Sequence, residues 1–115
     1  GNDELPLIAP DVPMAEALLV MTTKRFGCVG IIEKGGTFLG IITDGDLRRH
    51  MDPALLIEPA GNVMTKSPAT ISPNALASEA LAIMNTRSIT NLFVLDGNYP
   101  VGIIHIHDCL RAGVA

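Results

Sequence analysis

Two stretches of the 115-residue chain decide the fold: GIITDGDLRR, which runs from Gly40 to Arg49, and GIIHIHDCLR, which runs from Gly102 to Arg111. Each begins with a glycine and two isoleucines and reaches an aspartate after a few further residues. A β-branched run that leads into an aspartate is typical of a strand that passes into a helix. The chain therefore carries the same predicted strand-to-helix motif twice.

The similarity between the two copies extends well before the motif. Residues 8–49 align with residues 71–111 at an offset of 63 residues, which becomes 62 after a single deletion. The identical pairs that precede the motif include Ile8/Ile71, Pro10/Pro73, Glu16/Glu79, Ala17/Ala80, Leu18/Leu81 and Met21/Met84. Duplication of one unit explains this pattern better than chance.

Each copy predicts the element order β-α-β-β-α, which makes the fold class α/β. A short strand ending at Ile8 or Ile71 comes first. The apolar residues of the next segment are spaced as on one face of a helix; they are Met14, Ala17, Leu18 and Met21, and in the second copy Ala77, Ala80, Leu81 and Met84. Two apolar runs joined by a glycine-containing turn follow as strands, over 28–32 and 38–42 and over 92–95 and 101–104. The last helix of each copy is expected to begin near Asp46 or Asp108.

The domain organisation that we expect is a first repeat over residues 1–50, a linker over 51–62 and a second repeat over 63–115. The linker contains two prolines and is expected to be ordered, with a short helical turn over 54–57. Neither copy is long enough to bury both faces of a three-stranded sheet. We therefore expect the two repeats to pack as a pseudo-two-fold pair.

Composition excludes several classes of protein. Apolar residues make up 48% of the chain and charged residues 17%, which argues against intrinsic disorder. The net charge of -4, with one Tyr, three Phe and no Trp, is unsuited to binding nucleic acid. The chain has no apolar run long enough to span a membrane, and no signal peptide is expected from its first residues, GNDELP. Cys28 and Cys109 are expected to be buried thiols in a reducing, cytoplasmic compartment.

The duplicated pattern resembles a tandem cystathionine-β-synthase (CBS) domain pair. Each repeat of that family ends in a glycine-led strand, a hydroxyl residue, two further residues and an aspartate. Thr43 and Asp46 stand at the hydroxyl and aspartate positions in the first copy, and in the second copy His105 replaces the hydroxyl residue ahead of Asp108. NVMTKSPATISP, residues 62–73, is similar to the entry into a second CBS repeat.

A narrower resemblance is to the D-arabinose 5-phosphate isomerases, in which an N-terminal sugar-isomerase (SIS) domain precedes two CBS repeats. TDGDLRR at residues 43–49 and HIHDCLRAGV at residues 105–114 carry this resemblance. It implies a regulatory module of an enzyme that makes a precursor of Kdo, the acidic sugar of lipopolysaccharide. Nothing in the chain resembles the SIS domain, so no catalytic residue is expected within it.

The CBS resemblance implies a nucleotide in a cleft between the repeats. A carboxylate at Asp46 or Asp108 can accept hydrogen bonds from ribose hydroxyls, and Thr43 can donate to a phosphate. The alternative is that both aspartates only cap their helices. His105 and His107 alternate at a predicted strand end, so both are expected to face an acidic sugar. One alternative is a packing or capping role. The other is a metal site, although two histidines supply only two ligands and no Cys or carboxylate is spaced to complete the set. The other residues expected to line a cleft are Gly27, Cys28, Thr70, Ile71, Ile89, Thr90 and Asn91.

Three functions remain open from the sequence. The first is feedback sensing of a nucleotide-linked metabolite, for which CMP-Kdo fits the sparse cationic residues better than ATP does. The second is a general adenine-nucleotide sensor. The third is a structural module with empty clefts. No metal or other cofactor is expected. The expected partners are the SIS domain of the same protein and a second copy of the chain, bound through exposed apolar helix stripes.

Overall fold

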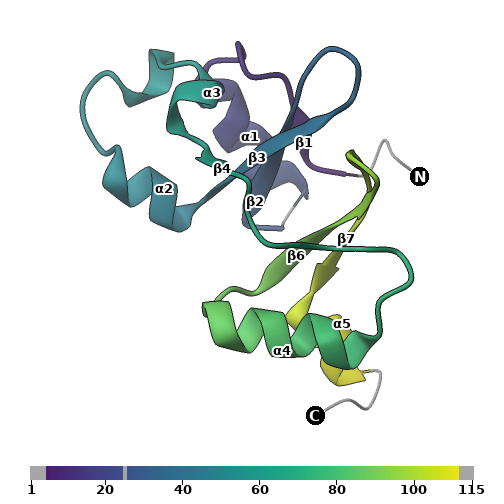
Figure 1. The fold of residues 1–115 in the computed structure, drawn as a ribbon. Coiled ribbons are helices and arrows are strands. Elements are labelled where there is room, and N and C mark those ends of the chain that lie inside the picture. Colours follow the sequence, from purple (N-terminus) through teal and green to yellow (C-terminus); the bar gives the residue numbers. More distant parts are fainter. Residues whose placement is uncertain (1–4, 25, 112–115) are drawn as a thin grey trace. The chain divides into compact units, whose positions relative to one another are not determined.

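The computed structural model describes residues 5–24 and 26–111 of the chain and divides them into two compact units (Figure 1). The first unit extends to Pro68 and the second begins at Ala69. Each unit holds one sheet and its own apolar core. The predicted α/β class and the order β-α-β-β-α within each repeat are confirmed.

The first sheet has the strand order β1-β2-β3-β4. Strand β1 (Leu7–Ile8) is parallel to β2 (Cys28–Ile32), and β2, β3 (Phe38–Thr43) and β4 (Thr65–Lys66) are successively antiparallel. Helix α1 (Met14–Lys24) connects β1 to β2, as a crossover between parallel strands requires. Helix α2 (Asp44–Arg49) follows β3 directly.

The second unit repeats this arrangement with three strands in its described residues. Strand β5 (Thr70–Ile71) is parallel to β6 (Asn91–Asp96), which is antiparallel to β7 (Tyr99–His105). Helix α4 (Ala77–Arg87) joins β5 to β6, and α5 (Ile106–Arg111) follows β7. Figure 1 shows α4 and α5 side by side. Both antiparallel pairs have a register shift at equivalent residues, Ile31/Ile32 and Val94/Leu95, so the duplication extends to a β-bulge.

The predicted helix stripes form the cores. Met14, Ala17 and Met21 are buried in the first unit, and Ala80 and Met84 are buried in the second. They pack against alternate residues of the strands, because one face of each sheet is turned toward the helices. The remaining buried members of the two clusters are Val29, Ile31, Ile42, Leu55, Ala60 and Val63 in the first and Ile71, Leu92 and Cys109 in the second.

The segment between the repeats is ordered, as predicted, and it contains more regular secondary structure than the predicted helical turn. The predicted helical turn is present as the 3-10 helix η2 (Leu55–Ile57), and helix α3 (Ala60–Val63) and strand β4 follow it. Backbone hydrogen bonds from Met14 N to Glu58 O (2.9 Å) and from Ala60 N to Val12 O (2.8 Å) attach this segment to the start of α1. Residues 55–66 therefore belong structurally to the first unit.

The starts of the last helices differ from the prediction. Helices α2 and α5 begin at Asp44 and Ile106, two residues before the expected aspartates. Thr43 is the residue that precedes α2, and Asp46 is the third residue of the helix. The reason is the capping box, in which an acidic side chain at the third position accepts a hydrogen bond from the backbone N–H before the helix.

Gly40 and Gly102 occupy the same position of the motif but different surroundings. A Cβ atom at Gly40 would lie 2.5 Å from the carbonyl oxygen of Thr65 and 2.9 Å from Sδ of Met64, because β4 pairs with β3 at this point. A Cβ atom at Gly102 would approach only Val94, at 3.7 Å. The fourth strand thus requires glycine at position 40 of the first repeat.

We expect Gly40→Ala to lower the free energy of unfolding by about 1–3 kcal/mol, the usual cost of overpacking, because the backbone of β4 has to move. The matched variant Gly102→Ala is expected to change it by no more than about 0.5 kcal/mol. Urea unfolding of both variants measures the difference. Equal destabilisation by the two substitutions would contradict the close approach of β4.

Candidate functional site

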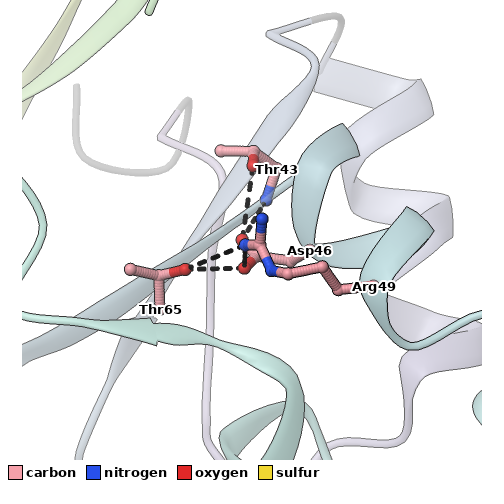
Figure 2. Close-up of polar contacts among 4 residues, drawn as sticks. All are labelled: Thr43, Asp46, Arg49 and Thr65. Atoms are coloured by element: carbon pink, nitrogen blue, oxygen red, sulfur yellow. Dashed lines mark hydrogen bonds and ion pairs between the residues drawn. The ribbon is translucent and has the colours of Figure 1, made fainter. Parts of the chain in front are cut away.

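The buried carboxylate of Asp46 is the centre of a polar network in the first repeat (Figure 2). Its Oδ2 atom accepts hydrogen bonds from Thr43 N (2.9 Å) and Thr43 Oγ1 (3.3 Å). Its Oδ1 atom accepts a hydrogen bond from Thr65 Oγ1 (2.6 Å) and forms an ion pair with the guanidinium of Arg49. Asp46 is only 2% exposed, whereas the side chain of Arg49 is 63% exposed. The network therefore joins the end of β3, helix α2 and strand β4.

Asp108 makes the equivalent capping contact in the second repeat. Its Oδ2 atom accepts a hydrogen bond from the backbone N–H of His105 at 2.9 Å, the same distance as in the first repeat. Unlike Asp46, Asp108 is exposed to solvent. The duplicated aspartate thus has the same backbone partner in both copies, and its exposure differs.

Polar residues lie at the end of the second sheet where Asp108 caps the start of α5. Asn91, the first residue of β6, lies opposite His105, the last residue of β7. The backbone carbonyl of Thr90 accepts a hydrogen bond from Ile106 N (2.8 Å), and Asn91 Nδ2 lies 3.4 Å from Thr90 Oγ1. A hydroxyl, an amide and a carboxylate are therefore presented close to the start of α5.

The two histidines lie together, although not as two residues of one strand. His105 ends β7, and His107 is the second residue of α5 because the helix begins at Ile106. The backbone N–H of His107 donates to Nδ1 of His105 (3.0 Å), and the ring centroids are 4.7 Å apart. The predicted strand alternation was wrong, yet the start of α5 still brings the two imidazoles together, and Asp108 is the next residue of that helix. No group of three His, Cys, Asp or Glu side chains suited to a metal occurs in residues 5–24 and 26–111.

A cavity of about 290 Å³ opens next to Asp108 in the second unit. Asp108 and Ser72 are polar members of its lining. The other lining residues, which are mostly apolar, are Ile71, Pro73, Ala75, Leu76, Ala77, Val94, Ile104 and Cys109. The volume is close to the lower end of the range for small-molecule sites.

The remaining predicted site residues fall into two groups. Gly27, with a φ of 73°, and Cys28 lie at the start of β2, where Cys28 pairs with Thr43. They are therefore next to the Asp46 network. Thr70 and Ile71 pair with Phe93 and Val94, farther along β6 than Asn91, and Ile71 belongs to the core. Ile89 follows α4, donates its N–H to Met84 O (2.9 Å) and also packs against the core.

Thr65 is the member of the Asp46 network that sequence reasoning missed. It lies 19 residues after Asp46, in a strand that the sequence did not predict. Arg49 had a local signal, since residues three apart on a helix are neighbours and an aspartate three positions before an arginine forms an ion pair. Thr65 had no such signal, because only the pairing of β3 with β4 brings it to the carboxylate.

Burial makes Cys28 a poor nucleophile. Desolvation, with a smaller contribution from the negative charge of Asp44, raises the pKa of the Cys28 thiol from its ordinary 9.0 to about 12. Cys28 and Cys109 are both buried and free, as predicted from their apolar neighbours. The thiol of Cys28 therefore lines the start of β2 as a small apolar group.

The raised pKa of Cys28 predicts a loss of stability in alkaline solution. Between pH 9 and about 12 the unfolded chain releases this proton and the folded chain keeps it, so the free energy of unfolding falls as pH rises. We expect Cys28→Ala to have a shallower decline than the parent chain. Urea unfolding just below pH 9 and about one pH unit above it measures the slope. Identical slopes would show that Cys28 ionises normally.

The two aspartates are expected to differ in their contribution to stability. Asp46→Ala removes a buried carboxylate with four donor contacts and is expected to cost about 2–3 kcal/mol. Asp108→Ala removes an exposed cap and is expected to cost about 1 kcal/mol. Chemical denaturation of both variants tests this order, and a larger loss for Asp108→Ala would refute it.

Comparisons with known proteins agree with the duplicated fold. The CBS domain family model matches residues 2–53 and 60–115. A CBS-domain protein of Agrobacterium tumefaciens superimposes with a TM-score of 0.84 at 26% identity, covering 95% of this chain and 89% of that one. A CBSX2 protein solved in complex with AMP superimposes with a TM-score of 0.82 at 20% identity, covering 97% of this chain and 89% of its own.

Sequence relatives include sugar-phosphate isomerases. The chain is 42% identical to arabinose 5-phosphate isomerase KdsD of Yersinia pestis and 40% identical to that of Escherichia coli K12. It is 43% identical to an uncharacterised protein of Rickettsia prowazekii. These alignments cover 96–100% of this chain and 34–36% of the relatives, so the chain spans about a third of their length.

No helix in the part of the chain that the structure describes is long and apolar enough to cross a membrane. The family match spans nearly the whole chain in two parts, and the second part begins at residue 60, within the last segment of the first unit. The glycine-led motif lies at the end of each matched repeat, and its aspartate accepts a hydrogen bond from the backbone N–H of the last residue of the strand. The chain belongs to the CBS domain family and consists of two CBS repeats.

Proposed function

We propose that the chain is the regulatory region of an arabinose 5-phosphate isomerase and that its second repeat binds a nucleotide-linked sugar acid such as CMP-Kdo. Identity of 40–42% to two such isomerases over at least 96% of the chain supports the first part. The catalytic SIS domain would lie in the remaining two thirds of the enzyme. Two buried free thiols suit the reducing cytoplasm, where this enzyme would act.

One observation carries the second part: an exposed carboxylate, two imidazoles, a hydroxyl and an amide gather at one end of the second sheet. Asp108 can accept hydrogen bonds from a ribose diol. His105 and His107 can donate to a phosphate or a sugar carboxylate, and the side chains of Thr90 and Asn91 can bind sugar hydroxyls. The Asp108 side chain is accessible, and the adjoining cavity adds apolar surface.

Charge favours a ligand with few phosphates. The chain has 8 Lys and Arg residues against 12 Asp and Glu residues. A triphosphate carries more negative charge than CMP-Kdo and needs more cationic partners to offset it. We therefore place CMP-Kdo, and CMP more weakly, ahead of ATP. Binding of the activated sugar would provide feedback from the end of the pathway to its first enzyme.

AMP is the second candidate ligand, because the CBSX2 protein with a similar fold was solved with AMP bound. A module that binds no nucleotide and only holds catalytic domains together is the third candidate. Exposed leucines on or beside the helices suit such association: Leu19 of α1 is 66% exposed, and Leu76, just before α4, is 67% exposed. The homodimer that these residues suggest remains a prediction.

Titration calorimetry with CMP-Kdo, CMP, AMP and ATP separates the three candidates. We expect CMP-Kdo to bind most tightly, and Asp108→Ala to weaken it by about 10- to 150-fold, which corresponds to about 1.5–3 kcal/mol for hydrogen bonds to a charged group. The matched control is Asp96→Ala, which removes the same charge from the far end of β6.

The control variant is expected to bind like the parent chain, because Asp96 is the last residue of β6, at the opposite end of the strand from Asn91 and its partner His105. Tight binding of AMP or ATP with no heat from CMP-Kdo would replace the proposal with an adenine-nucleotide sensor. Absence of binding by all four compounds would favour the structural module.

A further inference from the structure

The Asp46 carboxylate already has a full set of donors from its own chain. A carboxylate offers about four lone-pair positions, two on each oxygen. Thr43 supplies two donors to Oδ2, and Thr65 and Arg49 supply one each to Oδ1. A ribose hydroxyl can reach this carboxylate only by replacing one of these contacts, and the 2% exposure of Asp46 leaves little surface for it.

Thr65 connects the Asp46 network to the segment that leaves the first unit. Thr65 begins β4, the last strand of the first unit, and Ser67 follows with a positive φ of 50°. Pro68 is the last residue of the unit, and the second unit begins at Ala69. The bond from Thr65 Oγ1 to Asp46 therefore holds the chain to helix α2 just before it leaves the first repeat.

Arg49 covers the Asp46 carboxylate from the solvent side. Its guanidinium contacts Oδ1 of Asp46 and also lies 3.5 Å from Thr65 Oγ1. It neutralises the buried charge, so the carboxylate is stable without an external cation or ligand.

We propose that Arg49 and Thr65 are built-in occupants of the first-repeat carboxylate, so that Asp46 anchors the connecting strand and the chain binds one ligand, at Asp108. The two copies of one motif would thereby have separate tasks, structural in the first repeat and ligand binding in the second. The anchoring part stands on the contacts of Asp46 alone, whereas the single ligand rests on the proposed function. Arg49 and Thr65 are positioning residues, because they act through Asp46.

A double-variant cycle tests the anchor without any ligand. We expect Asp46→Asn and Thr65→Val each to lower the urea midpoint, and the double variant to lower it less than the two shifts combined, because both remove one interaction. Hydrogen exchange at residues 65–67 is expected to rise in both single variants. Additive shifts with unchanged exchange in this segment would overturn the anchor.

Thr70→Val is the control for the threonine substitution. Thr70 also begins a short strand at the edge of its sheet, in the second unit. We expect its loss to combine additively with Asp46→Asn, since the two residues lie in different units. Arg49→Gln is expected to lower the urea midpoint. Arg49→Lys is expected to lower it less, because Lys keeps the charge although it lacks the planar guanidinium.

Calorimetry with CMP-Kdo, and with AMP as a second probe, tests the single ligand. We expect one equivalent per chain, lost or weakened at least tenfold in Asp108→Asn and retained within about twofold in the matched Asp46→Asn variant. Two equivalents in the parent chain, or binding that disappears in Asp46→Asn, would overturn the single-ligand assignment. If neither compound binds the parent chain, the proposed function fails together with this part, and the double-variant cycle still decides the anchor.

Discussion

The hydrogen bond from the last residue of the glycine-led strand to an aspartate three residues later organises both repeats. A helix begins with backbone N–H groups that have no partner inside the helix, and the residue before it needs an acceptor as well. Asp46 and Asp108 meet this need with the same 2.9 Å contact. Because the contact fixes how the helix leaves the strand, it also decides which side chains stand at that end of each sheet.

The two repeats have diverged around this shared contact. In the first, β4 returns to pair with β3, which requires Gly40 and brings Thr65 to the carboxylate. In the second, the described residues contain no fourth strand, and Asp108 stays exposed beside His105 and His107. A duplicated motif can in this way retain its fold while the surroundings of one polar group change from closed to accessible.

Family membership and function stand on different grounds for this chain. The CBS fold follows from the family match and from the two β-α-β-β-α units. The choice of ligand depends on a small number of polar side chains in one repeat and on the sparse positive charge of the chain. Folds are shared among proteins with different ligands, so the chemistry of the site and not the fold has to carry a functional argument.

Periodicity in the sequence determined most of the fold. The helix stripes at Met14 and Ala17 and their equivalents, the two hairpins and the duplication are local patterns of hydrophobic residues, and each is present in the structure. Of the candidate site, the sequence identified both aspartates and both histidines by their place in the motif. Tertiary structure alone decided that β4 exists and that Thr65 reaches Asp46, because strand pairing joins residues far apart in the chain. It also decided that Asp46 is buried and Asp108 exposed, since burial depends on neighbours that a linear motif does not contain.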